Sequence, residues 1–333
     1  MGAFTSTRTR ARTTLGRVAV LCVGIGVLAA CEAPPPTPTE PTYVALGDSY
    51  QSGFLIAPYV AGSPEGCYRS EKSYSELLAA ARPALQPMRN MTCSGATTAD
   101  LTSSQLSGQP AQFDALVSAT TLVTLGMGGN DIGFSSIVSG CNVAVTLGGL
   151  NPCRDKFDHG GSDDRYPLIA AMRASLTSAY QQVAQRSPNA RVLAIGYPSV
   201  LPQNNSATCT LVASGDATFL RRLLSDLNAA IAGAVGDARA LGVNVEYVDL
   251  QTPSVGHEIC SASPWVTTIS NLFHPNAAGH AGFASIIGAQ IDNPPAPSTT
   301  TTSAATSAST TSASTSASTT SSTTTTTSAP AGP

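Results

Sequence analysis

Ser49 is the first residue of the sequence whose type and position could support chemistry. It follows residues 43–46, an apolar run of strand length that ends at Gly47. In an open α/β sheet, ligands bind beyond the carboxyl ends of the strands. A serine at that place can act as a nucleophile if a base takes its proton and hydrogen-bond donors hold the developing oxyanion.

Candidates for the base and for the donors lie farther along the chain. Gly95 and Asn130 each follow a segment with strand character, where a backbone or amide N–H can approach a ligand closely. His274 stands just before the last expected helix and is the candidate general base and acid. Each residue alone has an ordinary explanation, because Ser49 could cap a helix, Asn130 could form a turn and His274 could start a helix. Their joint occurrence favours nucleophilic catalysis.

The other polar candidates fit a catalytic role less well. His159 lies in a glycine-rich segment, His257 lies near a cysteine, and His280 falls inside the last expected helix, where packing is the expected role. Asp48 and Asp131 are expected to bind nearby backbone N–H groups and not to act as acids.

Strands and helices alternate along the chain. Apolar runs of strand length occur at residues 43–46, 121–125, 191–195 and 244–248, with a shorter one at 91–93. Helical patterns occur at residues 73–81, 112–118, 166–185, 216–241 and 276–290, with Asp216 as the expected N-cap of the fourth. This alternation predicts an α/β fold with a mainly parallel sheet that helices cover on both faces.

Four sequence blocks resemble, in the same order, those of the SGNH (GDSL) hydrolase family, in particular its actinobacterial secreted lipase and esterase branch. The blocks are Gly47-Asp48-Ser49, Ser94-Gly95-Ala96, Gly129-Asn130-Asp131 and the segment from His274 to His280. The resemblance implies a three-layer α/β/α sandwich with a flavodoxin-like sheet over residues 42–293, and hydrolysis of esters. We expect no cofactor and no metal site. The rival serine-esterase motif G-x-S-x-G is absent, because Gln51 occupies its second glycine position.

The resemblance also implies a role for each block. Ser49 would attack the ester carbonyl, and His274 would pass the proton to the leaving alcohol. The backbone N–H groups of Ser49 and Gly95 and the side-chain amide of Asn130 would form the oxyanion hole. The family often has an aspartate three residues before the histidine, but this chain has Asn271 there. We therefore expect a Ser–His dyad in which the backbone carbonyl of Asn271 orients the imidazole.

Both ends of the chain differ in composition from the middle. Residues 1–30 combine four arginines, no acidic residue and an apolar run too short to span a bilayer, which predicts an export signal. Cys31 directly follows and resembles the lipidated cysteine of bacterial lipoproteins; the alternative is an ordinary signal cleaved near Ala30. Residues 31–41 are a Pro/Thr-rich tether, and residues 294–333 are a Ser/Thr/Ala/Pro-rich tail expected to be disordered, with or without O-linked sugars. We expect an exported protein, either secreted or anchored to the cell membrane.

The charge and the cysteines agree with export. Loss of residues 1–30 lowers the formal charge from −3 to −7, and an acidic chain without a basic cluster is not expected to bind nucleic acid. Six cysteines then remain besides Cys31, and an even number without a CxxC motif favours disulfides over a metal site. The related branch of the family implies the pairs Cys67–Cys93, Cys141–Cys153 and Cys209–Cys260.

The segment after the candidate nucleophile bears on the substrate. Residues 54–60 are unusually apolar for a loop, and they could line an acyl-chain pocket or meet a lipid surface, or they could pack against the sheet. An acyl ester or lipid is the first expected substrate. A glycan O-deacetylase of the same fold and a surface protein that binds without catalysis are the alternatives. We expect a monomer.

Overall fold

A computed structural model of the chain describes residues 40–142, 152–159, 162–163, 165–204, 209, 212–268 and 273–294. The expected signal, Cys31, most of the tether and the tail beyond Pro294 lie outside the described residues. Residues up to Gly288 belong to one unit, and of the second unit, Ala289–Pro333, only residues 289–294 are described. Within the described part of the chain, none of the helices has the length and hydropathy needed to span a membrane.

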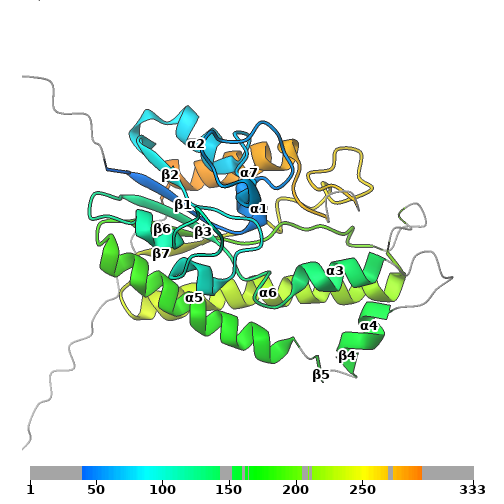
Figure 1. The fold of residues 1–333 in the computed structure, drawn as a ribbon. Coiled ribbons are helices and arrows are strands. Elements are labelled where there is room, and N and C mark those ends of the chain that lie inside the picture. Colours follow the sequence, from blue (N-terminus) through cyan, green and yellow to red (C-terminus); the bar gives the residue numbers. More distant parts are fainter. Residues whose placement is uncertain are drawn as a thin grey trace, which may run out of the picture. The chain divides into compact units, whose positions relative to one another are not determined.

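The central feature is a five-stranded sheet in which every neighbouring pair of strands is parallel (Figure 1). The strands, in spatial order, are β2 (Met88–Asn90), β1 (Tyr43–Gly47), β3 (Leu122–Gly126), β6 (Arg191–Ile195) and β7 (Val245–Val248). This is the flavodoxin-like order, in which the direction of winding reverses between β1 and β3. The crevice at that reversal lies beyond the carboxyl ends of these two strands, which Ser49 and Asn130 follow in the chain.

Helices cover both faces of the sheet. On one face α5 (Tyr166–Arg186) and α6 (Ser214–Ala240) lie side by side, and on the other lie α2 (Tyr74–Ala81) and α7 (Ala277–Asp292) up to Gly288 (Figure 1). The shorter elements are α1 (Ser49–Ser52), α3 (Phe134–Asn142), α4 (Pro152–Phe157), the 3₁₀ turns η1 (Glu65–Cys67), η2 (Pro83–Leu85), η3 (Thr98–Leu101) and η4 (Gln112–Ala115), and the antiparallel pair β4 (Asp158–His159) and β5 (Ser162–Asp163). The predicted α/β/α sandwich is confirmed.

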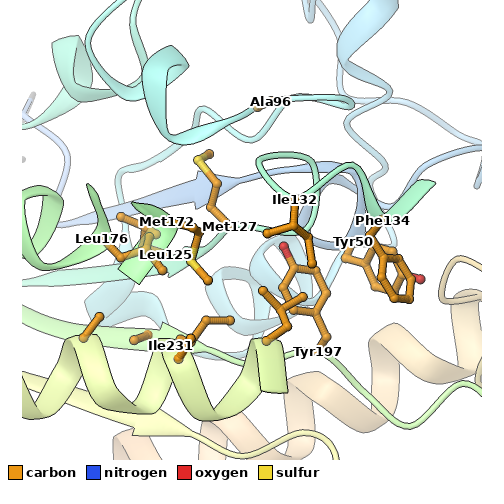
Figure 2. Packing of buried hydrophobic residues seen from close by; sticks show 14 of the residues in the cluster. Tyr50, Ala96, Leu125, Met127, Ile132, Phe134, Met172, Leu176, Tyr197 and Ile231 are labelled. Atoms are coloured by element: carbon orange, nitrogen blue, oxygen red, sulfur yellow. The ribbon is translucent and has the colours of Figure 1, made fainter. Parts of the chain in front are cut away.

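Alternating side chains of the strands enter two different cores, as the period of two in a strand requires. Val44 and Leu46 of β1 belong to the large apolar cluster that includes α5 and α6. Figure 2 shows part of that cluster, including Leu125, Met127, Met172, Leu176 and Ile231. On the opposite face, the hydroxyls of Tyr43 and Tyr74 both hydrogen bond to Thr124 Oγ1, at 2.9 and 3.2 Å. The sheet is therefore buried on both sides, which holds the strand ends rigidly.

The four longer predicted strands are present, each within one residue of its expected bounds. The short fifth strand is wrong in position, because the structure has it at Met88–Asn90 and not at residues 91–93. Met91 and Cys93 still donate their backbone N–H groups to the carbonyls of Ala45 and Gly47, at 2.8 and 3.0 Å. Residues 91–93 therefore still run beside β1, but they do not form a regular strand pairing with it.

Four of the five predicted helices are present, as α2, α5, α6 and α7, but one helix start and several short elements differ from the prediction. Asp216 is not the N-cap of α6: the helix begins at Ser214 after Ala213, and buried Asp216 accepts a hydrogen bond from the backbone N–H of Arg154 at 2.8 Å. Residues 112–118 form only the turn η4, and the short helices α3 and α4 were not predicted. Local sequence pattern does not report such tertiary contacts, which decide short elements.

Candidate active site

Ser49 occupies the first position of α1, directly after the end of β1. Asp48 caps this short helix, because its Oδ1 accepts a hydrogen bond from the backbone N–H of Tyr50 at 2.9 Å. Gly47 has a φ of +149°, and a Cβ there would lie 2.3 Å from Cγ of Gln51 and 2.5 Å from the carbonyl oxygen of Gly126. Only glycine lets the chain turn this tightly from strand to helix. The turn presents Ser49 at the edge of the sheet.

His274 lies against Ser49 although 225 positions separate them in the chain. Its Nε2 is 2.7 Å from Ser49 Oγ, and both residues are buried, with 3% and 5% of their surface exposed. The imidazole packs against the rings of Tyr50 and Phe54, with centroid distances of 4.6 and 4.8 Å. The hydroxyl of Tyr50 donates to the carbonyl of Phe273 at 3.2 Å, which ties the helix that begins at Ser49 to the loop that carries His274. Sequence reasoning missed both aromatic neighbours.

The segments that carry Gly95 and Asn130 are joined to each other. The side-chain amide of Asn130 donates to the carbonyl of Ala96 at 2.9 Å. Asp131 accepts from the backbone N–H of Thr98 at 3.1 Å, and Asp48 accepts from Tyr50, as the sequence predicts for both aspartates. Ser49 and Asn130 line the same small cavity, whose walls are Asp48, Ser49, Tyr50, Gly129, Asn130, Phe134, Ser135 and Tyr197.

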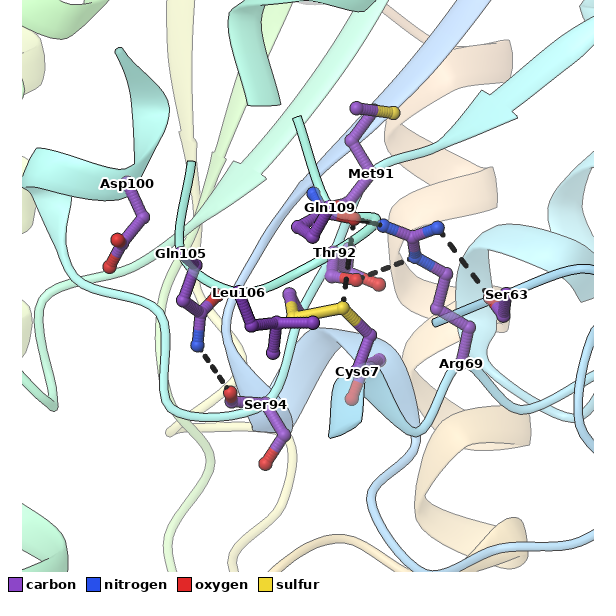
Figure 3. Close-up of a disulfide and its surroundings, with 12 residues drawn as sticks. Ser63, Cys67, Arg69, Met91, Thr92, Ser94, Asp100, Gln105, Leu106 and Gln109 are labelled. Carbon is purple, nitrogen blue, oxygen red and sulfur yellow. Dashed lines mark hydrogen bonds between the residues drawn. A yellow bond between two sulfur atoms is a disulfide. The ribbon is translucent and has the colours of Figure 1, made fainter. Parts of the chain in front are cut away.

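Two of the three expected disulfides are present. Cys67 is bonded to Cys93 and Cys209 to Cys260, and the side chains of Cys141 and Cys153 lie outside the described residues. The first bridge holds the segment before Gly95, where the backbone N–H of Ser94 also donates to the carbonyl of Cys67 at 3.2 Å. In Figure 3 the buried guanidinium of Arg69 lies beside this bridge and donates to the Thr92 carbonyl at 2.7 Å and to Gln109.

Tyr197, two residues after the end of β6, is a site residue that sequence reasoning missed. Its hydroxyl accepts the backbone N–H of Gly129 at 2.8 Å and donates to Oδ2 of Asp48. The sequence signal was weak, since Tyr197 stands between Gly196 and Pro198, which indicate only that a strand has ended. Burial raises the pKa of Asp48 to about 7, and the hydrogen bond from Tyr197 opposes that rise.

Of the histidines whose side chains the structure describes, His257 and His280 make their contacts away from Ser49. His280 is fully buried in α7, where its Nδ1 accepts the backbone N–H of Tyr74 at 3.2 Å. Burial, and secondarily the nearby His274, lower the pKa of His280 to about 3, so it is neutral and packs, as predicted. His257 stacks on Trp265 with the ring centroids 4.2 Å apart, and the side chain of His159 lies outside the described residues.

Asn271 lies outside the described residues, so its carbonyl as the partner of His274 stays a prediction. Among the described residues, no three His, Cys, Asp or Glu side chains gather closely enough to hold a metal ion.

Comparisons with known proteins agree with this geometry. Residues 45–281 match the GDSL-like lipase/acylhydrolase family. Lipase 2 of Streptomyces coelicolor is 35% identical over 81% of this chain and 92% of that lipase. The crystal structure of an extracellular lipase from Streptomyces rimosus has a TM-score of 0.60 and 30% identity, covering 74% of this chain and 98% of its own. For a phospholipase A1 from Streptomyces albidoflavus the TM-score is also 0.60, with 31% identity over 75% and 99% of the two chains. The chain therefore belongs to the GDSL-like lipase/acylhydrolase family and is a lipase or esterase of that family.

Proposed function

We propose that this protein is an exported serine ester hydrolase that cleaves acyl esters with Ser49 as nucleophile and His274 as general base and acid. The observation that carries the proposal is the 2.7 Å contact between Nε2 of His274 and Oγ of Ser49 at the carboxyl edge of the sheet. This distance lies within the range that a general base needs to take a proton directly.

The proposed reaction proceeds through an acyl-enzyme. Ser49 Oγ attacks the ester carbonyl carbon while Nε2 of His274 takes the hydroxyl proton. His274 then gives that proton to the leaving alcohol, and water repeats the sequence to release the acid. The carbonyl of Asn271 would orient the imidazole through Nδ1. The rings of Tyr50 and Phe54 cover the imidazole and limit its contact with water.

Three N–H donors are proposed to hold the oxyanion. No acceptor among the described residues takes the backbone N–H of Ser49 or of Gly95, so both are available to a substrate oxygen. The amide of Asn130 uses one N–H on the carbonyl of Ala96 and retains a second. Each such donor typically contributes about 3–4 kcal/mol to stabilising the transition state.

The loop at residues 54–60 supports an acyl ester or lipid as the substrate. Leu55 and Tyr59 are 47% and 41% exposed, so these two side chains of the loop do not pack against the sheet. Phe54 packs against His274 on one side and Tyr68 on the other, and Tyr68 packs against Tyr59. This aromatic series runs from the proposed base to the surface. An acyl chain would lie along it, and the phospholipase A1 of similar structure agrees with a lipid substrate.

Export is proposed from residues 1–30 and from the two disulfides, which form and persist outside the cytoplasm. The similar lipase of Streptomyces rimosus is extracellular. Lipidation of Cys31 would anchor the protein to the membrane, with residues 31–41 as the tether. The hydrolase domain is proposed to act as a monomer.

Labelling by a serine-reactive phosphonate tests the proposed nucleophile. Incubation with an alkyl p-nitrophenyl phosphonate should add one phosphonyl group, and peptide mass spectrometry should locate it on Ser49. The same experiment on Ser52→Ala, which changes the neighbouring buried serine, should give the same label. No label on Ser49 in the folded protein would favour a binding protein that has kept the fold without catalysis.

A further inference from the structure

We propose that Tyr197 is a positioning residue for this reaction, because it joins the turn that carries Ser49 to the loop that carries Asn130. The inference rests on the proposed function, and it assigns to Tyr197 a role that acts through the oxyanion hole and not through contact with the substrate.

Three hydrogen bonds link four residues across the site. The backbone N–H of Gly129, which precedes Asn130, donates to the Tyr197 hydroxyl at 2.8 Å. That hydroxyl donates to Oδ2 of Asp48, the residue before Ser49. The other carboxyl oxygen of Asp48 accepts the backbone N–H of Tyr50 at 2.9 Å. One hydroxyl therefore sets the spacing between the nucleophile and an oxyanion donor.

Tyr197 itself is held firmly. Its side chain is buried and packs edge-on against the ring of Tyr50, with the centroids 5.2 Å apart. Its backbone N–H and carbonyl both bond to the side chain of Asn228 on α6, at 2.8 and 2.9 Å. A Cβ on Gly129 would lie 3.1 Å from the hydroxyl oxygen, so the glycine allows this close approach. The bridge is thus anchored on α6, just after the end of β6 and outside the two segments that it joins.

The protonation state suits a bridge. Burial, and then the neighbouring Asp48, raise the pKa of Tyr197 well above its ordinary value, so the hydroxyl keeps its proton. It can therefore donate to Asp48 while a lone pair accepts from Gly129. Asp48 offers an acceptor oxygen in either of its protonation states.

Loss of the hydroxyl would leave two buried polar groups without a partner, the N–H of Gly129 and Oδ2 of Asp48. The loop that carries Asn130 would then lose its fixed spacing from Ser49. Because a misplacement of about 1 Å can cost about 100-fold in rate, we expect Tyr197→Phe to lower kcat about 10- to 100-fold. KM for a short ester should stay within about threefold, because no substrate contact is removed.

Tyr180→Phe is the matched control. Tyr180 is also fully buried, on α5, and its hydroxyl has no hydrogen-bond partner among the described residues. The same substitution there removes no bridge, so kcat on p-nitrophenyl butyrate should match that of the wild type. Thermal unfolding of all variants shows whether each is folded at the assay temperature.

A double-mutant cycle with Asn130→Ala separates positioning from a general structural role. If Tyr197 acts through the oxyanion hole, Tyr197→Phe should reduce kcat much less in the Asn130→Ala background than in the wild type. An equal loss in both backgrounds, or an unchanged kcat in Tyr197→Phe alone, would overturn the proposal. If Tyr197→Phe does not fold, Asp48→Ala removes the acceptor at the other end of the bridge, together with the cap on the Tyr50 N–H, and enters the same cycle.

Ser49→Ala keeps this test apart from the proposed function. Full activity in folded Ser49→Ala would refute the proposed nucleophile, and with it the role of Tyr197 in positioning that residue. If Ser49→Ala is inactive but Tyr197→Phe reduces kcat equally with and without Asn130→Ala, only the role of Tyr197 is refuted.

Discussion

At the scale of single residues, the proposed site is a serine and a histidine, Ser49 and His274, in direct contact and packed among buried neighbours. Tyr50 and Phe54 pack on the imidazole, and Asp48 fixes the turn of the nucleophile. Asp48 is buried and has a pKa near 7, so this carboxyl is placed for hydrogen bonding and not for charge stabilisation alone.

Asn130 is the one proposed oxyanion donor that a substitution can delete, because the other two are backbone groups. We predict that Asn130→Ala lowers kcat about 100- to 1,000-fold, equivalent to about 3–4 kcal/mol. Steady-state kinetics on a p-nitrophenyl ester measures this loss. Asn90→Ala is the control, since its side chain bonds to Glu76 and Thr92 and does not line the cavity beside Ser49. Activity of Asn130→Ala close to the wild-type value would remove Asn130 from the oxyanion hole.

The residues that the sequence predicts best are those marked by rare combinations near strand ends. Ser49 and Asn130 follow apolar runs, and His274 precedes a helix. The sequence therefore predicts that these three residues lie close together at one edge of the sheet. Tyr197 could not be predicted in this way, because its role depends on hydrogen bonds to Gly129 and Asp48, which are distant from it and from each other in the sequence. Tyr50 and Phe54 likewise become neighbours of His274 only in the folded chain.

At the scale of elements, His280 joins α7 to α2. It is neutral, and its Nδ1 accepts the N–H of Tyr74 at the first position of α2. The pKa of His280 is about 3 in the fold against an ordinary value of 6.5, so the unfolded chain binds a proton that the folded chain does not. Burial of His280 therefore costs no stability above pH 6.5, where the histidine is neutral in both states. As pH falls from 6.5 toward 3, the free energy of unfolding decreases, because protonation favours the unfolded chain.

The test compares the wild type with His280→Gln at several pH values. Asp48 has the opposite dependence between its ordinary value of 3.8 and about 7, so only the difference between the two proteins isolates His280. The wild-type free energy of unfolding, minus that of His280→Gln, should decrease as pH falls from 6.5 to 4, by at most about 1.4 kcal/mol per pH unit. Urea denaturation measures it, with His257→Gln as control. A difference that does not vary with pH would contradict a buried neutral His280.

The loop at residues 54–60 should determine the preference for acyl length. Replacing exposed Leu55 and Tyr59 by serine removes apolar surface next to the aromatic series. We predict that Leu55→Ser/Tyr59→Ser lowers kcat/KM at least about tenfold on a palmitoyl ester and less than about threefold on an acetyl ester, since each buried CH₂ is worth about 0.8 kcal/mol. Leu241→Ser, at a 60% exposed leucine after α6, should change neither rate. An equal fall on both esters would mean that the loop does not bind the acyl chain.

At the scale of the whole molecule, two disulfides close long segments of the chain. Cys67–Cys93 and Cys209–Cys260 span 26 and 51 positions, and each should stabilise the fold by about 3–4 kcal/mol. Replacing either pair by alanine should therefore lower the Tm. Only loss of the Cys67–Cys93 bridge should also lower kcat, because it holds the segment that carries Gly95. Equal kcat losses in both variants, measured where both are folded, would show that the bridge has no special role at the site.

The fold was more predictable than its connections. The four long strands and four long helices have strong periodicity, and their alternation is sufficient to predict a parallel sheet covered on both faces. The predicted position of β2 and the predicted start of α6 were wrong. The first depends on hydrogen bonds to β1, and the second depends on the bond between Asp216 and the backbone N–H of Arg154. Short elements gain most of their stability from such distant contacts, which no local window contains.

The account's central claim is that Ser49 carries out the chemistry, and hydrolysis of p-nitrophenyl esters from acetyl to palmitoyl tests it most directly. Ser49→Ala should lose at least about 1,000-fold in kcat on every ester that the wild type hydrolyses. Ser52→Ala, at a fully buried serine in the same turn, should remain active and serves as the control. If folded Ser49→Ala hydrolyses these esters as fast as the wild type, the nucleophile is elsewhere and the account is wrong.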